Sequence, residues 1–125
     1  MKRISLKIKA VIGISPNIIK FPAGSKERLN DIFLEKLHKE NYKVYDWNAI
    51  IADGINPNLS AEKLYINTIK IKNKHLVMLL MHCNADNKKT CEALPMIINY
   101  NKSQRYEFKT ISSETPEFYF KYKSK

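Results

Sequence analysis

The residue of this chain best suited to acid–base chemistry is His82, which ends an apolar stretch. Residues 75–82 read His-Leu-Val-Met-Leu-Leu-Met-His, and six consecutive apolar residues predict a strand that is buried on both faces. Because side chains alternate along a strand, Leu80 and His82 are expected to share one face. An imidazole at the end of a buried strand is where an α/β enzyme would place a group that transfers protons. A histidine that merely ends a core strand and faces solvent fits the same residues equally well.

Two cysteines lie close to His82 but do not form a recognisable metal motif. Cys83 and Cys91 are the only thiols of the chain. Zinc sites usually pair ligands about two to four residues apart and need a second such pair, which does not follow here. Two cysteines do not make a disulfide framework either. We therefore interpret both as incidental thiols.

The charge of the chain raises the question of an anionic partner. Its 125 residues carry a formal net charge of +10, yet of the 22 basic residues only Arg3, Arg28 and Arg105 are arginine. The lysines are scattered rather than gathered on one element, which argues against a nucleic-acid-binding protein. An apolar content of 44% is typical of a globular protein, and this length suits one domain or part of a larger one.

The first residues of the chain do not resemble a targeting signal. Lys7 and Lys9 interrupt any continuous apolar segment, so we predict neither a signal peptide nor a transmembrane span. Taken as written, the chain is expected to stay in the cytoplasm.

Apolar stretches that predict strands alternate along the chain with amphipathic stretches that predict helices. Strands are expected near residues 18–21, 42–47, 75–82 and 106–111, and helices near residues 25–39, 60–71 and 88–101. Ser25 and Ser60 are the expected N-caps, and residues 3–12 fit a helix or a strand equally well. Such alternation predicts parallel strands with helices outside them, in an open sheet or an arc of a barrel. Four strands cannot close a barrel, so the expected fold is incomplete.

Three short motifs, in order along the chain, resemble those of one enzyme family. Residues 20–25, Lys-Phe-Pro-Ala-Gly-Ser, resemble the third motif of the polysaccharide deacetylases, the NodB-homology hydrolases also called carbohydrate esterase family four. Residues 45–48, Tyr-Asp-Trp-Asn, with Asp53 after them, resemble the fourth motif, and residues 80–82, Leu-Met-His, resemble the fifth. The resemblance implies that the chain corresponds to the C-terminal half of the family's domain.

The resemblance implies a fold and a chemistry. The family's domain is a distorted (β/α) barrel, so this α/β chain would be a partial (β/α) barrel, the C-terminal half of a TIM-like deacetylase barrel. Residues 1–118 would form this part of the domain and residues 119–125 a basic tail. The family removes acetyl groups from N-acetylated sugars of peptidoglycan or chitin. It uses a divalent metal, usually zinc, to polarise the amide and activate water.

The family's fifth motif supplies an acid. By the resemblance, His82 would be the general acid that protonates the departing amine. Asp46, or less favourably Asp53, would tune His82, because a neighbouring carboxylate favours the charged imidazolium.

The remaining matched residues would bind substrate or stabilise charge. Leu80 would line the pocket of the acetyl methyl group, and Trp47 would form an apolar wall for the sugar or the methyl. The backbone N–H of Ala23 would help to stabilise the oxyanion. Lys20 stands in place of the motif's arginine, which keeps the charge but loses the bidentate fork.

The family's first two motifs do not occur in these 125 residues. There is no Asp-Asp pair and no His-x-x-x-His, and those motifs supply the catalytic base and the protein ligands of the metal. We therefore expect a truncated deacetylase with no metal cofactor of its own and no activity by itself. The alternatives are a non-catalytic remnant that binds glycans and one half of a split enzyme, completed by a separate N-terminal half. The expected partner is an N-acetylated polysaccharide, and full-length relatives are exported or bound to the cell surface.

Overall fold

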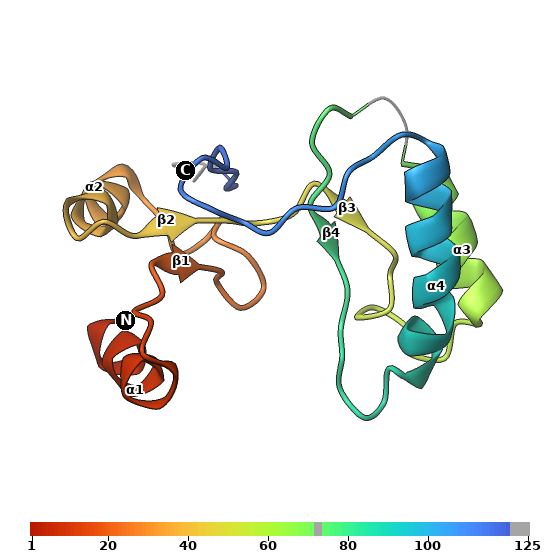
Figure 1. Ribbon diagram of the computed structural model, residues 1–125, viewed down its shortest axis with the longest axis horizontal. Helices are drawn as coiled ribbons and strands as arrows, with labels where there is room; N and C mark the ends of the chain where they lie inside the picture. Colours follow the sequence, from red (N-terminus) through yellow and green to blue (C-terminus); the bar gives the residue numbers. More distant parts are fainter. Residues whose placement is uncertain (72–73, 121–125) are drawn as a thin grey trace. The chain divides into compact units, whose positions relative to one another are not determined.

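The structure of the chain is a computed structural model that describes residues 1–71 and 74–120 (Figure 1). Its elements are, in order, α1 (Lys2–Ile12), β1 (Ile18–Ile19), α2 (Asp31–Lys39), β2 (Lys43–Val44), β3 (Ala49–Ile50), α3 (Ala61–Ile69), β4 (Leu79–Leu80) and α4 (Lys88–Ser103). The chain divides into two compact units. The first unit is Met1–Asp46 with Pro116–Lys125, and the second is Trp47–Thr115.

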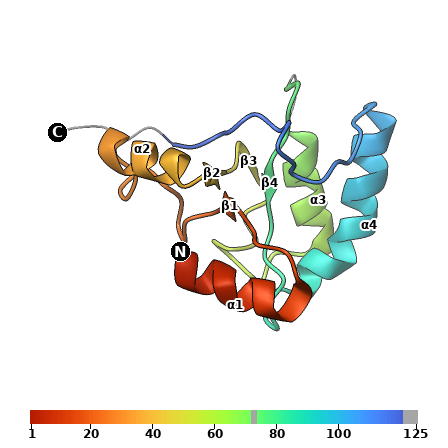
Figure 2. The same ribbon diagram turned by 60° about the vertical axis from the view of Figure 1, so that its left-hand side comes forward.

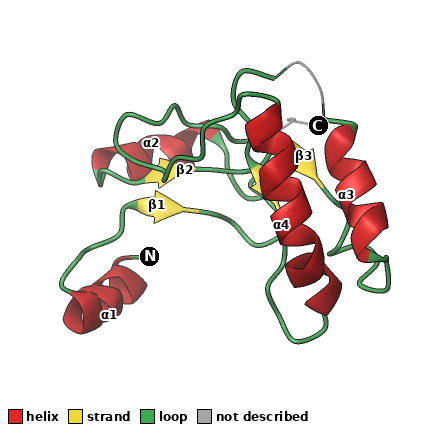
Figure 3. Ribbon diagram, turned by 45° about the vertical axis from the view of Figure 1, so that its right-hand side comes forward, coloured by secondary structure: helices red, strands yellow, loops and turns green. Residues whose placement is uncertain are grey.

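The first unit contains a parallel pair of strands, β1 and β2, which lie side by side in Figure 3. Ile18 is opposite Lys43 in this pair, and Ile19 is opposite Val44. Helix α2 begins later than expected, because its N-cap is Asn30, whose side chain accepts a hydrogen bond from the Phe33 N–H. Ser25 is therefore not the cap of this helix. The buried core of the unit consists of Phe21, Leu29, Leu37 and Val44.

Helix α1 settles the open alternative for residues 3–12 in favour of a helix. It ends at Gly13, whose φ of 76° and N–H bond to the Lys9 carbonyl form a left-handed C-cap. Its buried residue is Ser5, and the hydroxyl of Ser5 donates to the Pro16 carbonyl at 3.0 Å. Most of its apolar side chains are exposed, among them Ile4, Leu6, Val11 and Ile12.

The C-terminal segment of the first unit runs beside β2. Tyr45 and Phe118 form a parallel bridge, and the Asp46 N–H donates to the Phe118 carbonyl at 2.6 Å. Glu117 accepts from the Val44 N–H at 2.7 Å with one carboxylate oxygen. Phe118 is thus held by backbone pairing and Glu117 by its side chain, whereas residues 121–125 of the expected basic tail lie outside the described residues.

The second unit packs two helices beside a second parallel strand pair. In this pair Ala49 is opposite Leu79 and Ile50 is opposite Leu80. Ser60 caps α3 as expected, accepting from the Lys63 N–H. Figures 1 and 2 show α3 and α4 side by side. The buried core of the unit consists of Ile51, Leu64, Ala93 and Ile97.

The strands depart from the sequence expectation. β3 lies where a loop was expected, and residues 106–111 form no strand. β4 covers only Leu79–Leu80 of residues 75–82 and is half-buried rather than buried on both faces; among the described residues it pairs with β3 alone. After α4, Arg105 adopts a left-handed φ of 65°, and the Tyr106 hydroxyl donates to the Lys74 carbonyl. No strand within residues 1–71 and 74–120 pairs with residues 106–111. The strands of the described residues form two separate pairs and no closed barrel.

The described helices include none that is long and apolar enough to cross a membrane.

Candidate active site

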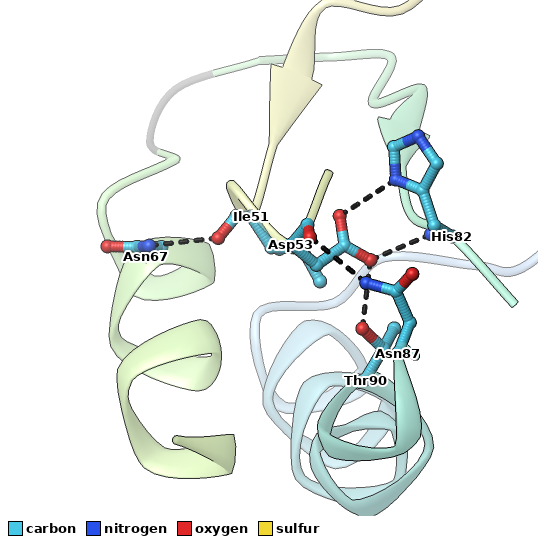
Figure 4. Close-up of polar contacts among 6 residues, drawn as sticks. All are labelled: Ile51, Asp53, Asn67, His82, Asn87 and Thr90. Carbon is cyan, nitrogen blue, oxygen red and sulfur yellow. Dashed lines mark hydrogen bonds and ion pairs between the residues drawn. The ribbon is translucent and has the colours of Figure 1, made fainter. Parts of the chain in front are cut away.

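In the second unit, the side chains suited to proton transfer are His82, just beyond the end of β4, and the carboxylate that contacts it. Nδ1 of His82 lies 3.1 Å from Oδ1 of Asp53, and the backbone N–H of His82 donates to Oδ2 of the same carboxylate at 2.7 Å (Figure 4). The Asp53 side chain is buried, whereas the His82 side chain is 40% exposed. A buried carboxylate bonded to a half-exposed imidazole is an arrangement that holds and transfers a proton. We call Asp53 and His82 the acid–base pair.

Helix α4 holds Asp53 in place from a second side. The Thr90 hydroxyl donates to Oδ2 of Asp53 at 2.9 Å, and the Asn87 side-chain amide donates to the Asp53 carbonyl at 3.0 Å (Figure 4). Asn87 is the N-cap residue of α4, but its side chain makes no capping bond. It bonds the Asp53 backbone instead. From α3, Asn67 donates to the Ile51 carbonyl at 2.9 Å, which fixes the end of β3 just before this loop.

These bonds set the charge of Asp53. Burial by itself would raise the pKa of the Asp53 carboxyl, but the hydrogen bonds from the His82 backbone and ring and from Thr90, together with the charge of His82, lower the pKa below its ordinary value. Asp53 is therefore an anion at neutral pH. An anion beside Nδ1 favours a proton on that nitrogen, so Nε2 is the nitrogen left for a bound molecule.

The expected ranking of the two aspartates needs correction. Asp46, the first choice as partner of His82, accepts the Ser25 N–H at 3.1 Å, the Ser25 hydroxyl, and the Phe120 N–H at 2.8 Å. Asp46 is buried, and these donors occupy its carboxylate within the first unit. Asp53, the second choice, is the carboxylate that pairs with His82. The role of Asp46 is to tie the turn before Ser25 to the C-terminal segment.

That turn carries Ala23. Ala23 has a φ of 60° and Gly24 a φ of 86°, so two consecutive residues adopt left-handed geometry. The Gly24 N–H closes the turn on the Phe21 carbonyl at 3.0 Å. Ala23 is an exposed residue, and the role of its N–H at an oxyanion stays a prediction.

The other predicted site residues are divided between the units. Lys20 is exposed at the end of β1, in the first unit. Trp47 and Leu80 are half-buried in the second unit, Leu80 as the last residue of β4. Their roles remain predictions.

The described residues do not fit the metal that the family resemblance implies. Within residues 1–71 and 74–120, no group of three or more His, Cys, Asp or Glu side chains is arranged to hold a metal ion. His38 pairs instead with Glu117 at 2.9 Å, and Cys83 and Cys91 are exposed free thiols.

Comparison with solved structures decides what this fold resembles. A polysaccharide deacetylase from Bacillus cereus matches with a TM-score of 0.81 and 27% identity, over 93% of this chain and 57% of that one. The catalytic domain of a peptidoglycan N-acetylglucosamine deacetylase from Eubacterium rectale matches with a TM-score of 0.82 and 20% identity, over 98% and 59%. The fold of this chain resembles part of a polysaccharide deacetylase. A family 4 carbohydrate esterase from Streptomyces lividans, in complex with acetate, matches with a TM-score of 0.70 and 20% identity, over 96% and 58%.

The expected resemblance to the polysaccharide deacetylases is thus confirmed, and its extent is defined. The chain spans between 57% and 59% of the length of these solved proteins. No family model matches the sequence, and a search of curated proteins finds no match.

Sequence reasoning missed the residues that support the acid–base pair. Asn67 and Thr90 lie in the helices expected near residues 60–71 and 88–101, and Asn87 lies just before the second of these, with no role at a site predicted for any of the three. A polar pair three residues apart at the start of a helix is a signal of capping, but here both side chains bond Asp53, in the loop that follows β3. The sequence contains no signal that would reveal this.

Proposed function

We propose that this chain forms the C-terminal part of a NodB-homology polysaccharide deacetylase barrel and supplies its general acid, His82. The substrate class would be an N-acetylated polysaccharide such as peptidoglycan or a chitin-type polymer. The observation that carries the proposal is the buried Asp53 carboxylate bonded to His82, beside a strand end of a deacetylase-like fold. That pair is what protonation of a departing amine requires.

In the proposed step the two nitrogens of His82 have different tasks. Nδ1–H would donate to Asp53, which sets the plane of the ring. Water, deprotonated by a base that another part of the enzyme would supply, would first add to the acetyl carbonyl. Nε2–H would then give its proton to the nitrogen of the tetrahedral adduct as the carbon–nitrogen bond breaks, so that acetate and a neutral amine are the products. By the family resemblance, the N–H of Ala23 would donate to the oxyanion on the acetyl carbonyl, and Leu80 and Trp47 would contact the methyl group.

We propose further that the 125 residues on their own do not hydrolyse the substrate. The proposal is supported by the sequence, which has no Asp-Asp pair and no His-x-x-x-His, and by the lack of a metal-holding group among the described residues. Loss of one electrostatic element of an active site commonly lowers the rate by about a hundredfold or more, and here the base and the metal ligands are both missing.

Zinc titration of the purified chain, combined with an assay of acetate release from a chito-oligosaccharide, tests this point. We expect no stoichiometric zinc binding and no turnover above buffer. Tight one-to-one binding accompanied by turnover would refute it.

One feature of the first unit favours a second candidate, in which another polypeptide completes the enzyme. Ile4, Val11 and Ile12 on α1 are 65%, 84% and 62% exposed, which is unusual for three aliphatic side chains of one helix. A second polypeptide carrying the base and the metal ligands would cover them. Co-expression with such a polypeptide should give a stable complex, and replacing Val11 with Asp should weaken it. A complex that forms equally well with the Val11→Asp variant would argue against this face as the contact.

A further inference from the structure

The turn that carries Asp53 contains a glycine that its backbone geometry does not require. The Ile55 N–H donates to the Ala52 carbonyl at 3.1 Å, which makes Asp53 and Gly54 the two central residues of the turn. Glycine is demanded at the second central position where φ is positive. Gly13 and Gly24 are the glycines with a positive φ among the described residues, and Gly54 is not one of them. An alanine would therefore suit the backbone at position 54.

The reason for glycine lies instead in the ring of His82. A Cβ atom placed on Gly54 would lie 2.3 Å from Cε1 of His82, 2.8 Å from Nδ1 and 2.9 Å from Nε2. Carbon atoms in contact are normally about 3.5–4.0 Å apart, so a methyl group and the ring cannot both keep their positions. The ring thus lies directly against the backbone of the turn, in space that any side chain would fill.

The position of the ring is also fixed from the other direction. Asp53 Oδ1 holds Nδ1, while Oδ2 holds the backbone N–H of His82. Moving the ring outward to admit a methyl group therefore lengthens the bond between Nδ1 and Oδ1 but leaves the backbone bond in place. One substitution would then separate the imidazole from its carboxylate without removing either group.

We propose that Gly54 is a positioning residue for His82, whose missing side chain lets the imidazole lie against the turn and reach Asp53. The relevance of Gly54 to catalysis rests on the proposed function of His82, whereas the steric claim rests on the geometry alone. A bulkier residue at position 54 would leave a deacetylase-like fold whose histidine is detached from its carboxylate.

A double-mutant cycle on the full chain tests the steric claim. We expect Gly54→Ala to lower the melting temperature by about 5 °C or more, because the methyl group displaces a packed ring. In the His82→Ala background the same change should be neutral or raise the melting temperature by about 1–4 °C, because alanine restricts the unfolded chain more than glycine. A Gly54→Ala variant that fails to fold while the double variant folds would support the claim as well. An equal fall in melting temperature in both backgrounds, or failure of both variants to fold, would overturn it.

A spectroscopic measurement tests the positioning role separately from stability. In nitrogen-15 spectra of the histidine rings, recorded above pH 8, we expect His82 in the parent chain to carry its proton on Nδ1, facing Asp53. In Gly54→Ala the proton should move to Nε2, with the signals of His38 and His75 unchanged as internal references. An unchanged Nδ1–H form of His82 in the variant would overturn the proposal. Neither measurement uses turnover, so failure of the proposed deacetylase role would leave this test intact.

Discussion

Replacing Asp53 with Asn is the perturbation that probes the acid–base pair most specifically. The substitution keeps the size of the side chain and one acceptor oxygen, but it removes the charge. In the folded chain the carboxylate receives a backbone N–H from His82 at 2.7 Å and the Thr90 hydroxyl at 2.9 Å, and it pairs with Nδ1 at 3.1 Å. An amide can accept at one atom, so its NH₂ group has to face one of these partners.

The cost of Asp53→Asn follows from these contacts. A net hydrogen bond to a charged group contributes about 1.5–3 kcal/mol, and the residue is only 2% exposed, so solvent cannot replace what is lost. The amide can keep the bonds to the His82 backbone and Thr90 by placing its oxygen there, which leaves the ring contact as the part that is lost. We therefore expect the free energy of unfolding at neutral pH to fall by about 1.5–3 kcal/mol.

The pH dependence of this difference has a defined sign. The pKa of Asp53 is lowered in the folded chain from an ordinary value of 3.8, so its charge stabilises the fold above that value. The contribution is lost as the pH falls below about 3.8 and passes through the folded pKa. The free energy of unfolding of the parent chain should thus exceed that of Asp53→Asn by the full amount at pH 5–7, and by progressively less towards pH 2.

Urea unfolding at pH 7, 5, 3.5 and 2.5 measures the difference directly. Asp86→Asn serves as the matched control, because Asp86 is an exposed aspartate on the loop that follows His82. The control should change the free energy of unfolding by no more than about 0.5 kcal/mol. A difference between parent and Asp53→Asn that stays constant from pH 7 to pH 2.5 would refute the assignment of a charged, lowered-pKa carboxylate to this position.

Three further substitutions test other parts of the account. Thr90→Val removes the hydroxyl that donates to the carboxylate of the acid–base pair, and we expect the free energy of unfolding, measured by thermal unfolding, to fall by about 1–2 kcal/mol. Thr68→Val is the control and should lower it by less, because it loses only a bond within its own helix. Asp46→Asn should speed hydrogen exchange of the Phe120 amide at least tenfold, and unchanged exchange would contradict the proposed tie to the C-terminal segment. Ala52→Gly should stabilise the chain by about 1 kcal/mol in urea unfolding because its φ is 71°, and a loss of stability would show that this backbone is unstrained.

The helices were predictable from the sequence because their signals are local. Ser60 caps α3 as expected, and the helices near residues 60–71 and 88–101 form close to their expected positions. The strands were less predictable, because a strand exists only where a second strand pairs with it. Residues 106–111 have a strand-like alternation but no partner, while β3, inside an expected loop, pairs with β4.

The candidate site was predictable in part for the same reason. His82 stood out because it ends an apolar run, and this property is visible in one short segment. Its partner was not visible there, since Asp46, in an expected strand, and Asp53, in the loop after it, are both far from His82 in the sequence. The choice depends on β3, which carries the chain from Ala49 to the loop of Asp53 and pairs with the strand before His82. The supporting bonds from Thr90 depend on how α4 packs, which no local pattern specifies.

The most direct test of the central claim is acetate release from a chito-oligosaccharide. It would compare this chain alone with the chain assembled with a polypeptide that carries the Asp-Asp and His-x-x-x-His motifs, in the presence of zinc. The proposal predicts no turnover for the chain alone. It predicts turnover for the assembly that falls about a hundredfold or more when His82 is replaced by Ala, the scale expected for a lost general acid. Turnover by the chain alone, or an assembly whose rate is unaffected by His82→Ala, would contradict the claim that this chain supplies the general acid of a deacetylase.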